Sequence, residues 1–134
     1  MTIDTDVEVI VISKEELQLG IQRSQQQRQA FFEFWKKGVK LSGIEFFGDG
    51  SQVGYEKALA INDLQPIPNI NKKVLNKMSH GEAAFFASMI SFYNSAKADE
   101  LSEIANIKSI GDLKILDRER RNVIANLLIN YKGW

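Results

Sequence analysis

The chain has no cysteine and one histidine among its 134 residues. The lack of cysteine excludes disulfides, thiolate metal sites and thiol nucleophiles. A single histidine gives no basis for a multi-histidine metal site. Ser79 precedes His80 at the start of a helical pattern, where a serine caps the helix more often than it acts as a nucleophile. We therefore expect no catalytic, cofactor-binding or metal-binding residues, and a protein that is not an enzyme.

Long hydrophobic runs and net charge are also missing. Lys and Arg number 17, as do Asp and Glu, so no net charge draws the whole protein toward polyanions. No stretch approaches the roughly 18 apolar residues that span a bilayer. The chain begins with an acidic segment that contains Asp4 and Asp6, opposite in charge to the start of a signal peptide. We expect a cytoplasmic protein with no membrane partner.

The composition is that of one globular domain, with 44% hydrophobic and 25% charged residues. We expect a single domain over 1–134, divided into a mixed region (1–71) and a helical region (72–134). The acidic excess lies in the first region, chiefly in Asp4, Asp6, Glu8, Glu15 and Glu16.

The first region predicts one strand, one long helix and one hairpin. Alternating β-branched residues over 6–12 are typical of a strand. Ser13 followed by Glu16 resembles a capping box that opens a helix near Lys14, which Gly38 would end after Lys37. Residues 44–47 and 52–55 flank the turn 48–51 and predict a β-hairpin. The glycines at 48–54 lack the lysine of a phosphate loop and the ligand spacing of a calcium loop, so we expect only a turn.

The second region predicts helices over 72–78, 80–95, 98–105, from about 109, and over 117–131. The helix at 80–95 is apolar on nearly all sides and must be central. Gly133 could close the last helix and bring Trp134 onto Ile129. The fold class predicted is α+β and mainly helical. A small antiparallel sheet from the N-terminal half would pack against a C-terminal helical cluster.

The helix at 14–37 provides the leading functional hypothesis. Its apolar face begins at Leu17 and Ile21 and resumes at Phe31, but Ser24 and Arg28 lie between them. A helix that is polar at mid-length can project into solvent or meet a partner, and arginine beside aromatic residues matches the composition of binding hot spots. We expect an accessory or regulatory protein that binds another protein or a second copy of itself. The candidate contact residues are Arg23, Gln27, Arg28, Phe32 and Trp35.

The alternative is nucleic-acid binding through the helical region 97–121. Residues 104–113 loosely suggest two helices around a short turn, a motif that can bind phosphates. Asp112 and Asp117 oppose this interpretation because they would repel a phosphate. The candidate residues for this alternative are Lys108, Lys114, Arg118, Arg120 and Arg121.

Overall fold

The structure is a computed structural model that describes residues 13–134; the strand predicted over 6–12 lies outside them. Helices make up 71% of the described residues, and these contain no strand. The predicted α+β class with an antiparallel sheet is therefore wrong, and the described chain is predominantly helical. Its elements in chain order are α1 (Lys14–Ser42), η1 (Ile44–Phe46), α2 (Gln52–Lys57), η2 (Ile61–Leu64), α3 (Lys72–Leu75), α4 (His80–Ser91), α5 (Ser95–Ile104), η3 (Ile110–Ile115) and α6 (Arg118–Asn130).

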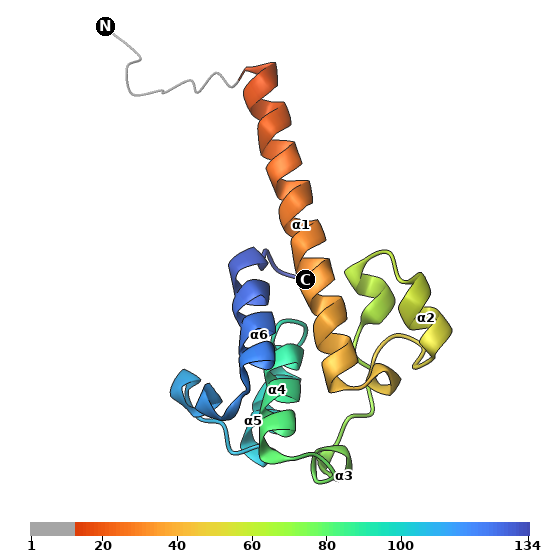
Figure 1. The fold of residues 1–134 in the computed structure, drawn as a ribbon, viewed down its shortest axis with the longest axis vertical. Helices are drawn as coiled ribbons and strands as arrows, with labels where there is room; N and C mark the ends of the chain where they lie inside the picture. Colours follow the sequence, from red (N-terminus) through yellow and green to blue (C-terminus); the bar gives the residue numbers. More distant parts are fainter. Residues whose placement is uncertain (1–12) are drawn as a thin grey trace, which may run out of the picture.

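The C-terminal half of helix α1 lies within the helical body of the molecule, and its N-terminal half projects from that body. Its C-terminal half packs against α6 and α4, while the shorter elements η1, α2 and η2 lie on its other side (Figure 1). The start predicted near Lys14 is confirmed: the Ser13 hydroxyl oxygen accepts a hydrogen bond from the Glu16 amide at 3.1 Å. Such a cap satisfies an amide that has no partner within the helix.

The predicted end of this helix at Gly38 is wrong, because α1 continues through that residue. Gly38 is buried, and a Cβ placed on it would collide with the side chain of Met89 in α4. The glycine therefore lets two helices approach closely rather than ending one. The helix ends instead at Gly43, whose φ of 123° is a backbone conformation that glycine adopts readily.

The predicted hairpin is also wrong. Ser51 caps α2 by accepting a hydrogen bond from the Gly54 amide, so the second predicted strand is helical. Phe47 does find an antiparallel partner, but the partner is Pro66 in the connector that follows η2. The Gly48 amide donates to the Gln65 carbonyl at 2.8 Å, which makes an isolated bridge rather than a sheet.

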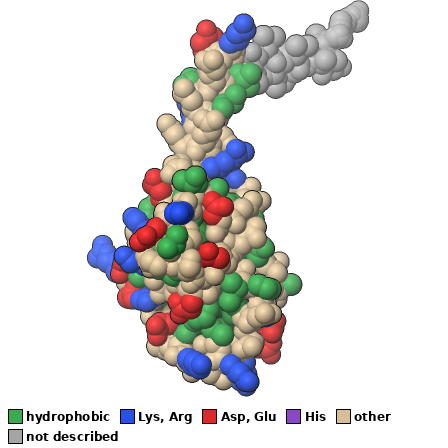
Figure 2. Space-filling view, turned by 90° about the vertical axis from the view of Figure 1, so that its right-hand side faces the viewer, with side chains coloured by type: hydrophobic (Ala, Val, Ile, Leu, Met, Phe, Trp, Pro, Cys, Tyr) green, Lys and Arg blue, Asp and Glu red, His purple; other side chains and the backbone are tan. Residues whose placement is uncertain are grey.

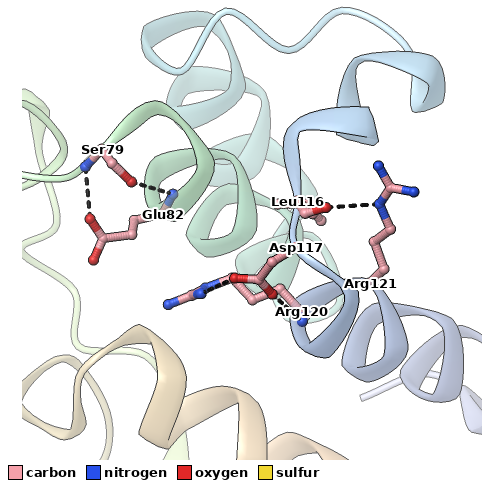
Figure 3. Close-up of polar contacts among 6 residues, drawn as sticks. All are labelled: Ser79, Glu82, Leu116, Asp117, Arg120 and Arg121. Carbon is pink, nitrogen blue, oxygen red and sulfur yellow. Dashed lines mark hydrogen bonds and ion pairs between the residues drawn. The ribbon is translucent and has the colours of Figure 1, made fainter.

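Helix α4 is central, as its sequence predicts. Nearly all of its apolar side chains are buried, and it contacts α1, α5, α6 and η3. The capping box predicted at its start is present. The Ser79 hydroxyl accepts from the Glu82 amide at 3.1 Å, and the Glu82 carboxylate accepts from the Ser79 amide at 2.9 Å (Figure 3). The Ser79 amide, which donates to the carboxylate, and the Ser79 hydroxyl beside it hold the pKa of Glu82 below its usual value, since both favour the charged form.

Trp134 is docked, although not where the sequence suggested. Ile129 is 70% exposed, whereas the Trp134 ring packs edge-on against Trp35 with centroids 4.8 Å apart. Its indole N–H donates to the Asn62 side-chain oxygen at 2.8 Å. The last residues thus cross α1 and reach η2, and they form one wall of the groove described next.

Candidate protein-interaction surface

The N-terminal part of α1, residues 14–30, projects from the helical body and is called the arm here (Figure 1). Every residue from 14 to 23 is exposed. Leu17, Leu19 and Ile21 keep 56%, 49% and 50% of their surface in contact with solvent. Hydrophobic side chains are accordingly visible along the projecting part in the space-filling view (Figure 2). Such side chains are stabilised by burial, so the arm carries an apolar surface that the described chain leaves uncovered.

Two of these apolar residues continue the buried face of the same helix. Ile21 follows Leu17 by four positions, Arg28 follows Ile21 by seven, and Phe32 comes four positions later. At 3.6 residues per turn these spacings keep all four side chains on one face. Leu19 lies about 160° from Ile21 around the helix axis by the same geometry. The face of Leu17 and Ile21 therefore leads directly to Arg28 and the helical body.

A groove of about 270 Å³ opens where this face meets the body. Its walls come from three separate segments: α1, residues 59–61 at the start of η2, and the end of α6 with the residues that follow it. Phe31 and Phe32 are both buried at its α1 side, whereas Leu59 is 85% exposed at its rim. The lining residues are Gln25, Arg28, Gln29, Phe31, Phe32, Leu59, Ala60, Ile61, Asn130, Lys132 and Gly133.

The charges that line the groove share one sign. Arg28 and Lys132 are its only charged lining residues within the described part of the chain, and both are basic. Lys132 Nζ donates to Ser24 Oγ at 3.2 Å, which holds the ammonium group beside the arm. The nearby Asp63 carboxylate already accepts from the backbone amides of Leu59 and Ala60 at 2.9 and 3.1 Å. The groove is thus apolar with a cationic edge.

The predicted contact residues divide between the groove, other faces of α1 and the core. Arg28 and Phe32 line the groove together. Gln27 contacts the C-terminal end of α6, where its Nε2 donates to the Ile129 carbonyl at 3.4 Å. Arg23 is exposed but does not line the groove, and at about 140° from Arg28 around the helix it lies outside the surface formed by Leu17, Ile21 and Arg28. Trp35 is 0% exposed, so it belongs to the core and forms no part of the surface.

Trp35 is held in the core by specific contacts. Its indole N–H donates to the Leu64 carbonyl at 2.9 Å, and its ring packs against Phe47 with centroids 5.8 Å apart. A buried indole usually finds such a hydrogen-bond partner. Trp35 therefore joins α1 to η2 and helps to position the groove.

Two of the five predicted nucleic-acid residues are engaged within the chain. Arg120 pairs with the Asp117 carboxylate and lies 5.7 Å from the centroid of the Phe85 ring. Arg121 Nε donates to the Leu116 carbonyl at 2.8 Å (Figure 3). Its guanidinium also contacts the Lys114 carbonyl. The backbone hydrogen bond from Arg120 holds the pKa of Asp117 below its usual value, so the pairing carboxylate stays charged.

Lys108, Lys114 and Arg118 are exposed and form the rest of that set. Asp112 lies among them and accepts hydrogen bonds from the amides of Lys108 and Ser109, which lower its pKa. The region therefore presents cations beside a fixed negative charge. Nucleic-acid binding stays a prediction, with three exposed cations to carry it.

A second apolar groove, of about 400 Å³, lies between η3 and α6. Ile110 and Leu128 on its walls are 79% and 61% exposed. Two basic residues, Lys114 and Arg121, also line it, and the Arg121 guanidinium donates to the Lys114 carbonyl. Nothing on this groove indicates the chemistry of an occupant, in contrast to the groove beside the arm.

The sequence alone did not reveal Lys132, Leu59 and Ile61 as residues of the groove beside the arm. They come from segments about 30 and 100 positions away from Arg28 along the chain. No local spacing or motif connects such distant segments, so only the packing of α1 against η2 and α6 brings them together.

His80 is the first residue of α4, and its Nε2 lies 2.9 Å from the Ala105 carbonyl oxygen. From residue 13 onward, no three potential metal-ligating side chains cluster together. The same residues contain no helix with the length and hydrophobicity needed to cross a membrane.

Comparisons with protein-family models, with curated proteins and with solved structures found no match.

Proposed function

We propose that this protein is a non-enzymatic interaction module that binds another protein through the arm of α1 and the adjacent groove. The observation that carries the proposal is the continuity of the exposed face of Leu17 and Ile21 with a groove edged by Arg28. An apolar centre with arginine beside aromatic side chains is the composition that dominates binding energy at protein interfaces.

The arm has a shape suited to this role. Residues 14–30 would be about 25 Å long at 1.5 Å per residue, and they are helical without tertiary cover over most of that length. Most of the stability of a helix in a protein comes from the packing of its apolar face, which the arm lacks over most of its length. A partner that covers Leu17 and Ile21 would stabilise the arm and bury its apolar face. Accessory or regulatory proteins can act through such a surface.

The test compares capture of a partner from an extract of the native host by three forms of the protein. Arg28→Glu reverses a charge at the groove, whereas Arg23→Glu reverses a charge at a similarly exposed site on another face of the same helix. We expect Arg28→Glu to reduce capture of a defined partner at least tenfold and Arg23→Glu to leave it unchanged. Equal capture by all three forms would contradict the proposal.

A further inference from the structure

The groove beside the arm specifies the chemistry of what fills it. Phe31, Phe32 and Ile61 offer an apolar wall, and Arg28 and Lys132 provide two positive charges at its edge. An occupant that satisfies both features carries hydrophobic side chains next to carboxylates. Like charges at the same place would be repelled.

The chain itself contains a segment of this composition, residues 1–12, which lie outside the described part of the structure. This segment has three carboxylates, at Asp4, Asp6 and Glu8, and no basic side chain. In an extended chain Ile10 and Ile12 lie on the same face as these carboxylates, because side chains alternate between the two faces. The sequence therefore offers negative charge and apolar surface within a few residues of each other.

The length of this segment matches the distance to the groove. From Ser13 to Arg28 the helix rises about 22 Å at 1.5 Å per residue. An extended chain covers that distance in about seven residues at 3.3 Å each. A chain that turned back from Ser13 along the arm would bring Asp6 about level with Arg28. The same calculation brings Ile12 within about 3 Å of the level of Leu17 and Ile10 within about 2 Å of the level of Ile21.

We propose that residues 4–7 occupy the groove of their own chain and that residues 8–12 lie along the arm. The carboxylates of Asp4 and Asp6 lie against Arg28 and Lys132, and Ile10 and Ile12, on the same side of the extended segment, cover the exposed face of Leu17 and Ile21. The next consequence rests on the proposed function: the segment competes with the partner protein for the same surface of α1. A partner must displace it, so the segment lowers the affinity of the arm for that partner.

The test uses paramagnetic relaxation in the full chain. The protein has no cysteine, so Thr5→Cys provides a single attachment site for a nitroxide spin label. We expect strong loss of amide signal intensity for Gln29, Ile61 and Gly133, which line the groove. Loss confined to the first turns of α1, with the groove signals unchanged, would overturn the proposal.

Two charge-reversal variants of the labelled protein show whether the contact depends on the groove. Arg28→Glu should restore the groove signals, because it replaces the attraction to Asp4 and Asp6 by repulsion. Arg23→Glu, on another face of α1, should leave them attenuated. Attenuation that persists unchanged in Arg28→Glu would contradict the electrostatic contact that the proposal requires.

A mixture of labelled and isotope-enriched molecules identifies which chain supplies the segment. If spin-labelled protein without isotope enrichment attenuates the groove signals of enriched, unlabelled protein, the segment fills the groove of a second copy. That result would overturn occupation within one chain. Unchanged signals in the mixture, with attenuation in the doubly labelled protein, support it.

The outcome is separable from that of the proposed function. Asp4→Lys combined with Asp6→Lys should increase capture of the partner, because it removes the competitor without altering the groove. Unattenuated groove signals together with Arg28-dependent capture would refute this inference and keep the proposed function. Attenuated groove signals without any Arg28-dependent capture would refute the proposed function and keep the occupation of the groove by the N-terminal segment.

Discussion

Replacing Trp35 by phenylalanine separates the role of this residue in the core from a role in binding. The substitution keeps an aromatic ring and removes the indole N–H that donates to the Leu64 carbonyl at 2.9 Å. Leu64 is 1% exposed, so its carbonyl would lose a partner in a site that water does not readily reach. A buried group left without its hydrogen bond costs about 1–3 kcal/mol.

The smaller ring also loses packing. Trp35 contacts Phe47 and Trp134 with centroids 5.8 and 4.8 Å apart, and aromatic pairs contribute about 0.5–1.5 kcal/mol each beyond burial. Partial loss of these contacts raises the expected total to about 2–4 kcal/mol of unfolding free energy. A small domain has roughly 5–15 kcal/mol in all, so Trp35→Phe should remain folded but with a clearly lower midpoint.

Urea unfolding followed by far-ultraviolet circular dichroism measures this difference. Arg28→Glu is the matched comparison from the same helix, and its exposed site predicts a change within about 0.5 kcal/mol. The reasoning would be refuted if Trp35→Phe unfolded at the wild-type urea concentration. It would also be refuted if Arg28→Glu lost as much stability as Trp35→Phe, since Arg28 would then be part of the core.

Three further predictions test other parts of the structure. Gly38→Ala should lower the free energy of unfolding, because overpacking costs about 1–3 kcal/mol and outweighs the gain in helix propensity of about 1 kcal/mol. Gly20→Ala is the control, since its site is open and no stability should be lost. Thermal unfolding of both variants measures the difference. Because the pKa of Glu82 is lowered in the folded state, its carboxylate stabilises the fold at pH values above the unfolded-state pKa near 4.5. This stabilisation is lost as the pH falls through the folded-state pKa. Glu82→Gln should therefore flatten the loss of stability with acid in this range, and an unchanged pH profile would argue against the capping bond from Ser79. Arg118→Ala should leave weak duplex binding, measured by fluorescence anisotropy at low and high salt, almost unaltered; a steep salt dependence that Arg118→Ala reduces would instead favour the nucleic-acid alternative.

Local sequence signals predicted the helix starts well. Ser13, Ser79 and Asp117 each cap the helix expected after them, because the capping bond joins residues only three positions apart. The central place of α4 also followed from its composition, since an apolar surface on all sides must be buried.

The errors arose where distant segments decide the conformation. Gly38 signals a helix end in isolation, but the close approach of Met89 makes it an interior packing residue. Residues 52–55 could pair with 44–47, yet the Ser51 cap makes them helical and Phe47 pairs with Pro66. Arg28 and Phe32 were identifiable on the long N-terminal helix, whereas Lys132 and Leu59 join them only through tertiary packing.

The most direct test of the interaction surface is photo-crosslinking from two neighbouring positions on the arm in the native host. Ile21 and Leu19 are equally exposed, at 50% and 49%, and point to opposite sides of α1. A photoreactive amino acid at position 21 should crosslink to a defined partner protein, and the same group at position 19 should give little product. Equal yields from both positions, or a product only from position 19, would contradict the assignment of this face as the binding surface.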